Sequence, residues 1–248
     1  MATGKTVIAF DLYGTLLSTE SIAHELAKLY GEEKAASIAA LWRRYQLEYT
    51  WRITSMGDYR TFSEITRGSL THALSEHGFE LSAGKTDQLM QAYDFLHVFP
   101  EIPAALKLVR ENSNLVDAYI FSNGTLEMVG TSVKSSPDLG PHASLFKSLI
   151  TVDDVKCYKP AARVYEHLVK EAGKEGSKSD VWLVSGNPFD VVGAKSAGLK
   201  AAWIDRAGKG WVDRLDTLHV PSIIATGVED AVKSILGWVK DAKARTKS

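Results

Sequence analysis

The sequence predicts an α/β fold, in which a doubly wound parallel sheet is interrupted by an inserted helical cap. Short apolar runs alternate with helical patterns along most of the chain, as is typical of parallel strands covered by helices. Between residues 18 and 97, however, only helical periodicity is found, which is more than a usual strand-to-strand connection needs. We therefore predict a core domain of residues 1–17 and 98–248 and a cap domain of residues 18–97.

The first strand places a carboxylate at the edge of this sheet. The segment Val7–Leu17 reads VIAFDLYGTLL, so an apolar run leads directly into Asp11 and a turn with Tyr13, Gly14 and Thr15. Open α/β sheets bind their ligands beyond the carboxyl ends of the strands. A carboxylate in that position can act as a nucleophile and form a covalent ester that water later removes.

The cap is expected to consist of helices separated by glycines. Thr61 and Glu64 have the spacing of a capping box, which marks the start of one of these helices. Gly31, Gly57 and Gly78 fall at the breaks. The expected helices span Glu20–Tyr30, Glu33–Ser55, Thr61–His77 and Ser82–Leu96.

Strands and helices alternate again after the cap. Expected strands are Val116–Phe121, Ser148–Val152, Val181–Val184, Ala201–Ile204 and Ser222–Ala225. Expected helices start near Pro103, after Thr125, at Ala162 (ending at Ala172) and at Val228, and the basic tail Lys240–Ser248 is expected to fray. Right-handed crossovers place the carboxyl ends of parallel strands at one edge. We therefore expect Asp11, Ser122, Lys159 and the Ser185–Asp190 turn to gather there.

Composition narrows the class of protein. The chain has 248 residues with 29 Lys and Arg against 30 Asp and Glu, a balance that does not suggest a nucleic-acid partner. Cys157 is the single cysteine, which excludes an internal disulfide and suits a reducing compartment. We find no Cys/His metal-site spacing, no signal peptide and no apolar stretch of transmembrane length. These features predict a cytoplasmic protein without a membrane partner.

Four blocks and one cap segment resemble the haloacid dehalogenase superfamily, and its L-2-haloacid dehalogenase branch in particular. The core blocks are FDLYGTLL at Phe10–Leu17, FSNG at Phe121–Gly124, YKPAARVYEHL at Tyr158–Leu168 and LVSGNPFDVVGAKSAGLKAAWIDR at Leu183–Arg206. The cap segment ALWRRYQLEYTWRITSMGDYRTF at Ala40–Phe62 resembles a run that recurs in that branch. The resemblance covers nearly the whole chain and implies a Rossmann-like core.

The resemblance implies hydrolytic dehalogenation of (S)-2-haloacids to (R)-2-hydroxyacids through an ester on Asp11. Most phosphatases of the superfamily have an aspartic acid two residues after the nucleophile, and Tyr13 stands there instead. A tyrosine, with an ordinary pKa of about 10, replaces that acid poorly, whereas a halide leaves without a proton. The site therefore has few acidic residues that could hold a metal ion. We predict no metal and no cofactor.

The same resemblance suggests roles for the other candidate residues. Lys159 would keep Asp11 ionised, supported by Thr15, and Arg43 would stabilise the departing halide. Asp190 would orient water or the lysine. The expected substrate-binding residues are Tyr13, Ser122, Asn123, Leu47, Tyr165, Ser185, Asn187 and Phe189. The family commonly reads S-S-N-x-W-D at the fourth block, so Gly186 and Phe189 depart from it.

Each of these residues also has a structural explanation. Asp11 could cap a turn, Lys159 could be an exposed lysine before proline, and Tyr165 and Leu47 could be ordinary packing residues. Three alternative functions stay open at this point: a Mg²⁺-dependent phosphatase, a hydrolase of other small 2-substituted carboxylic acids, and a catalytically silent binding protein. A homodimer is compatible with the resemblance.

Overall fold

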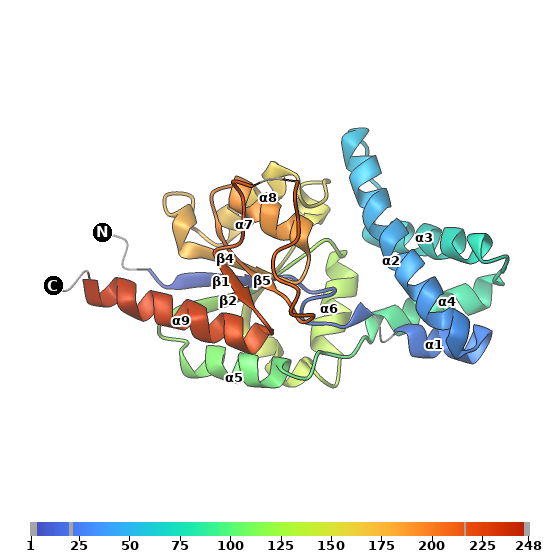
Figure 1. Cartoon of the computed structure of the whole chain (residues 1–248), viewed down its shortest axis with the longest axis horizontal. Helices are drawn as coiled ribbons and strands as arrows, with labels where there is room; N and C mark the ends of the chain where they lie inside the picture. The colour runs from blue at the N-terminus through green and yellow to red at the C-terminus, as the bar shows by residue number, and fades with distance from the viewer. Residues whose placement is uncertain (1–3, 20–21, 216, 246–248) are drawn as a thin grey trace.

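The computed structural model describes residues 4–19, 22–215 and 217–245, and within them the core is a six-stranded parallel sheet. The strand order is β3-β2-β1-β4-β5-β6 (Figure 1). The strands are β1 (Thr6–Phe10), β2 (Val116–Ser122), β3 (Phe146–Thr151), β4 (Val181–Ser185), β5 (Lys200–Ile204) and β6 (Ile223–Ala225). The predicted doubly wound parallel sheet is confirmed.

Strand β1 lies at the centre of the sheet, with β2 on one side and β4 on the other. Phe10, its last residue, pairs with Ile120 of β2 and with Val184 of β4. The strand order reverses at this point, and such a switch point is where open α/β sheets bind ligands. The register therefore brings the residues that follow β1, β2 and β4 to one edge.

Two helix pairs cover the faces of the sheet. Helices α5 (Ile102–Glu111) and α9 (Val228–Arg245) pack against each other, as do α7 (Ala162–Glu171) and α8 (Pro188–Ser196). Figure 1 shows the two pairs on opposite sides of the sheet, with α6 (Leu126–Lys134) toward the cap. Coverage on both faces explains why the strands read as continuous apolar runs.

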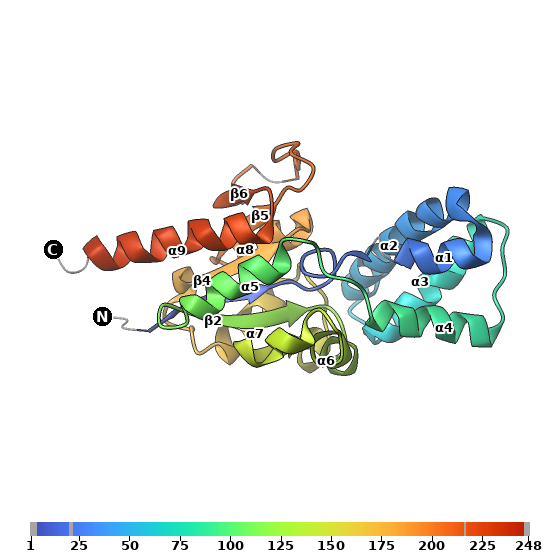
Figure 2. The same ribbon diagram turned by 90° about the horizontal axis from the view of Figure 1, so that it is seen from below.

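The segment between β1 and α5 forms a group of helices beyond one end of the core (Figure 2). These are α1 (Ile22–Tyr30), α2 (Glu32–Ser55), α3 (Phe62–Glu76) and α4 (Ala83–Asp94). Helix α3 has the predicted capping box, because Thr61 accepts a hydrogen bond from Glu64 N and Glu64 accepts one from Thr61 N. The predicted start of the first helix, Glu20, lies outside the described residues.

Two short segments join the cap to the core, and they run side by side. Leu17 and Val98 form an antiparallel bridge. Ser18 N donates to His97 O at 2.8 Å and Phe99 N to Leu16 O at 3.1 Å. The domain boundaries that we propose, after residue 17 and before residue 98, fall on this paired segment.

Two details differ from the sequence prediction. Strand β3 begins at Phe146, earlier than predicted. Helix α9 runs to Arg245, so the prediction of fraying from Lys240 is wrong for the described part of that tail. Val239 is buried, and extending an anchored helix costs much less than nucleating one. Among the described helices, none is both long and apolar enough to cross a membrane.

We expect Thr61→Ala to lower the free energy of unfolding by about 1 kcal/mol, because it leaves the first backbone N–H groups of α3 without their cap. Urea denaturation followed by circular dichroism measures this. The matched control is Thr71→Ala on the same helix, whose hydroxyl bonds only the carbonyl of Arg67. An equal loss in both variants would contradict a specific contribution from the cap.

Candidate active site

Asp11 lies directly after β1, at its carboxyl end, and the residue is 6% exposed. Its Oδ2 accepts hydrogen bonds from Thr15 Oγ1 at 2.7 Å, Asn187 Nδ2 at 2.8 Å and, at 3.4 Å, Ser185 Oγ. Its Oδ1 accepts one from Lys159 Nζ at 3.1 Å. Donors from three separate parts of the sequence, namely Thr15, Lys159 and the Ser185–Asn187 turn, therefore converge on one carboxylate.

Lys159 is almost completely buried and uses all three of its donors. Its Nζ donates to Asp11 Oδ1 at 3.1 Å, to Asp190 Oδ2 at 2.8 Å and to Phe121 O at 2.9 Å. The ammonium also lies 4.1 Å from the centre of the Phe121 ring. A buried ammonium needs such partners, so Lys159 and the two carboxylates form one ion cluster.

Asp190 lies behind this lysine, in the first turn of α8, and is fully buried. Burial raises the pKa of its carboxyl, and the Lys159 ammonium opposes that rise. Tyr165 donates its hydroxyl to Asp190 Oδ1 at 2.8 Å. We had predicted Tyr165 as a substrate-binding residue. Because the ring is completely buried and bonds Asp190, we now propose that it positions that carboxylate.

The turn after β4 contacts the turn after β1 directly. Gly186 N donates to Thr15 Oγ1 at 2.9 Å, and Asn187 N donates to Ser185 Oγ at 3.1 Å. A Cβ atom at Gly186 would lie 2.6 Å from Gly14 O. Gly186 stands where the family pattern has a serine. Because it has no side chain, it allows the two turns to approach closely.

Arg43 reaches from the cap to the core. Its Nη1 donates to Gln46 Oε1 at 2.6 Å, and its Nη2 donates to Tyr13 O at 3.2 Å and to Asn187 Oδ1 at 3.4 Å. Gln46 is a residue that the sequence did not single out. It also accepts from the Tyr93 hydroxyl at 3.1 Å. Arg43 and Gln46 are three residues apart on one helix, so their side chains lie on the same face. This spacing is the sequence feature from which Gln46 could have been identified.

Tyr13 is buried between cap residues. Its ring centre lies 5.8 Å from that of Phe62 and 5.4 Å from that of Tyr93. Burial raises the pKa of its phenol further above the ordinary value, so the hydroxyl stays protonated. A Cβ at Gly124 would lie 2.9 Å from the Tyr13 ring, which explains the glycine that ends the FSNG block.

The turn after β2 supports the lysine. Ser122 Oγ accepts from Gly124 N at 3.0 Å, and Asn123 Oδ1 accepts from Lys159 N at 3.1 Å. Both side chains are buried. The carbonyl oxygen of Asn123 is thus occupied within the protein, and the predicted binding of a substrate carboxylate by this turn remains a proposal.

Two other predicted residues lie where the cap meets the core. Leu47 is half-buried on α2, one turn beyond Arg43. Phe189 packs edge-on against Trp51, with ring centres 5.3 Å apart. The geometry thus connects Asp11, Thr15, Lys159, Ser185, Asn187 and Asp190 by hydrogen bonds, while Leu47 and Phe189 make no hydrogen bond to that cluster through their apolar side chains.

The comparison with known proteins agrees with this geometry. The family model of the haloacid dehalogenase-like hydrolases matches residues 5–198. The chain belongs to this family. Haloacetate dehalogenase H-2 of Moraxella sp. (strain B) is 36% identical over 204 residues, which cover 81% of this chain and 86% of that protein. An (S)-2-haloacid dehalogenase of Pseudomonas sp. (strain YL) is 34% identical, with 81% and 83% covered.

Solved structures of haloacid dehalogenases share the whole fold. The L-2-haloacid dehalogenase from Xanthobacter autotrophicus superposes with a TM-score of 0.83 at 26% identity, covering 94% of this chain and 99% of that chain. The same enzyme with chloropropionic acid covalently bound gives a TM-score of 0.82, with the same identity and coverage.

The hydrolase holds its nucleophile turn with a second charged pair that the sequence did not reveal. Arg206 Nη2 donates to Thr15 O and to Glu101 Oε1, both at 2.7 Å. The guanidinium lies 3.4 Å from the centre of the Phe99 ring. Arg206 ends the fourth sequence block, but nothing in that block shows that its partners lie on the turn after β1 and on the second linker.

The oxygen atoms that could hold a divalent metal ion at this site already accept hydrogen bonds within the protein. A cation between Asp11 and Asp190 would take the place that the Lys159 ammonium holds, and the carbonyl of Tyr13 accepts from Arg43 and Asn187. In the described part of this hydrolase, no three His, Cys, Asp or Glu side chains are grouped for a metal ion. Lys159 therefore supplies the positive charge at this position.

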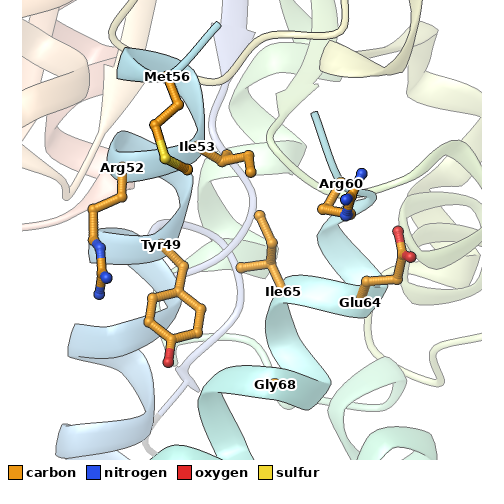
Figure 3. A pocket seen from close by; sticks show the side chains of 8 residues that line it. All are labelled: Tyr49, Arg52, Ile53, Met56, Arg60, Glu64, Ile65 and Gly68. Carbon is orange, nitrogen blue, oxygen red and sulfur yellow. The ribbon is translucent and has the colours of Figure 1, made fainter. Parts of the chain in front are cut away.

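A separate hollow of about 430 Å³ lies within the cap. Figure 3 shows Tyr49 and Ile53 of α2 and Ile65 of α3 around it. None of the candidate site residues lines this hollow, so it is separate from the Asp11 cluster.

We expect Gly193→Ala to lower both activity and stability. A Cβ at this position would lie 2.4 Å from the Tyr165 hydroxyl oxygen and 2.7 Å from Pro160 Cβ, so Tyr165 would have to move away from Asp190. Overpacking of this kind costs about 1–3 kcal/mol. Thermal unfolding and steady-state rates measure both effects.

The matched control is Gly130→Ala on α6, where an added Cβ meets nothing within 4 Å. It should keep full activity and gain up to about 1 kcal/mol from helix propensity. If Gly193→Ala behaves like this control, Tyr165 does not position Asp190.

Proposed function

We propose that this hydrolase converts (S)-2-haloacids and water to (R)-2-hydroxyacids and halide through an ester on Asp11. The observation that carries the proposal is a buried carboxylate whose Oδ2 accepts three hydrogen bonds while Oδ1 accepts one, from Lys159, next to a tyrosine where a phosphatase would need an acid. The (S)-2-haloacid dehalogenase at 34% identity and the neighbouring structure with covalently bound chloropropionic acid support it.

In the first step, we assign attack to Asp11 Oδ1, because Oδ2 already accepts three hydrogen bonds. A bond forms between Oδ1 and carbon 2 of the substrate, and the carbon–halogen bond breaks with its electron pair. The negative charge moves from the carboxylate to the halide, and no proton is needed. Attack from the side opposite the halide inverts the configuration at carbon 2, and the Arg43 guanidinium stabilises the departing anion.

In the second step, water attacks the ester carbonyl. Asp11 Oδ2 then develops negative charge, and we propose that Thr15, Asn187 and Ser185, the donors that already face it, stabilise that charge. Asp190 is fully buried behind Lys159, so we propose that it acts through that residue: Lys159 passes a proton to Asp190 Oδ2, takes the proton of the water, and the proton returns by the same path to the departing alkoxide. The carboxyl of Asp11 loses its proton to solvent, so each turnover releases one halide and one proton.

Haloacetate is a second candidate substrate, because the relative with 36% identity is a haloacetate dehalogenase. Haloacetate lacks only the substituent on carbon 2 and would pass through the same ester. A phosphatase is less compatible with the site, because Tyr13 is buried against Phe62 and Tyr93, its phenol has a raised pKa, and Lys159 bridges the two carboxylates.

We expect Asp11→Asn to reduce halide release from (S)-2-chloropropionate and from chloroacetate by about three orders of magnitude or more. A chloride electrode and a pH indicator together follow both products. Intact-protein mass spectrometry should detect the ester on the wild type and not on the variant. The matched control is Asp117→Asn, at the opposite end of β2, where the carboxylate pairs with Lys5 and Lys147. Equal turnover by Asp11→Asn would contradict the covalent mechanism.

We also expect EDTA to leave the rate unchanged, because the Lys159 ammonium occupies the space between the two carboxylates. Chloride release is measured before and after dialysis against EDTA, with p-nitrophenyl phosphate as a second substrate. Loss of activity that Mg²⁺ restores, or Mg²⁺-dependent release of phosphate, would favour the phosphatase alternative.

A further inference from the structure

Near the end of α2, aromatic side chains of the cap pack against aromatic side chains of the core. Trp51 packs against Phe189, and Tyr59 stacks on Tyr158 with ring centres 5.4 Å apart. The Tyr158 hydroxyl also donates to Arg60 O at 2.6 Å. These contacts hold the end of α2 and the segment that follows it against Phe189 and Tyr158 of the core.

On the side of the two linkers, a groove of about 910 Å³ reaches Arg43. We call it the α1–α2 groove. Small side chains on α2, among them Ala36 and Ala40, leave it open. Its lining residues come from α1, α2 and both linkers and are Ser18, Thr19, Ala23, His24, Ala36, Ala39, Ala40, Arg43 and residues 97–100.

A much smaller space continues this groove inward. It measures about 10 Å³ and shares Thr19, Ala39 and Arg43 with the groove. Its other lining residues are Ile22, Trp42, Gln46 and Tyr93. A space of this size holds about one water molecule. A halide ion is somewhat larger than a water molecule, so it passes only when a lining side chain such as Arg43 shifts, whereas a carboxylic acid of several heavy atoms needs a much wider opening.

Among the described residues that line the groove, Arg43 carries the formal charge, which suits an anion, and the carboxylate of Asp138 behind the wall pairs with His97 at 3.3 Å. Arg43 lies at its inner end, and His24 and His97 line its wall. Among the described residues that line either space, none is an aspartate or glutamate. The guanidinium that contacts Asn187 beside the nucleophile therefore also faces a route to solvent.

We propose that the α1–α2 groove is the exit route of the halide. The anion leaves past Arg43 while the organic group stays bound to Asp11, and the larger hydroxy acid leaves only when the cap moves. The inference rests on the proposed function, because halide must first form at Asp11. It adds that the halide and the hydroxy acid leave by different routes, the halide through the groove and the hydroxy acid when the cap moves.

The test fills the groove with Ala40→Trp and compares it with Ser37→Trp, which lies on the same helix but does not line the groove. We expect Ala40→Trp to form the ester in a single turnover at the wild-type rate, measured by rapid quench and mass spectrometry. Steady-state halide release should fall by about tenfold, or ~1.4 kcal/mol in activation free energy, because trapped halide reverses the displacement. The loss should be larger for iodide than for chloride.

Each outcome decides the proposal. Equal steady-state rates in Ala40→Trp and Ser37→Trp would overturn the exit route and leave the dehalogenase function intact. Absence of halide release from the wild type would overturn both. If Ala40→Trp does not fold, Ala36→Trp fills the same groove from one turn earlier. Slower ester formation in the filled variant would indicate that the groove admits substrate instead.

Discussion

The ammonium of Lys159 lies between the carboxylates of Asp11 and Asp190, and all three charges are buried. Removing three ions from water is costly, and their mutual attraction offsets that cost only when the remaining donors and acceptors are also satisfied. Much of the surrounding structure meets this condition. The carbonyl of Phe121 takes the third proton of the ammonium, and Tyr165 donates to Asp190. Deleting one member of the cluster would leave an uncompensated charge in the interior.

The position of this cluster follows from the topology of the sheet. Strand β1 lies between β2 and β4, so the turns that follow these three strands meet at one edge. Apolar strands end in short polar turns, which supply the hydroxyl and amide donors without distorting the hydrogen-bonded ladders. Gly186 allows the turns after β1 and β4 to touch. The strand order of the sheet therefore places the hydrogen-bond donors around Asp11. The cap adds Arg43 to this site.

Much of the fold and of the charge cluster could be predicted from the sequence. The alternation of apolar runs and helical periods located the strands, and the carboxyl-end rule brought together Asp11, Lys159 and Asp190. Particular side-chain contacts between elements could not be predicted. Gln46 looked like any polar residue of a helix, and Arg206 bonds a turn almost two hundred residues away in the chain. Periodicity reports which face of an element is buried, but it does not report which element covers that face.

The antiparallel pairing of Leu17 with Val98 has a consequence for how such proteins diversify. Because the cap leaves and rejoins the core at one paired point, its ends are already close, and the entropic cost of inserting it depends only weakly on its length. A helical group attached in this way can be exchanged, enlarged or rotated as a unit while the sheet keeps its register. The reacting carboxylate can thus be inherited unchanged while the chamber above it is rebuilt for a different acid.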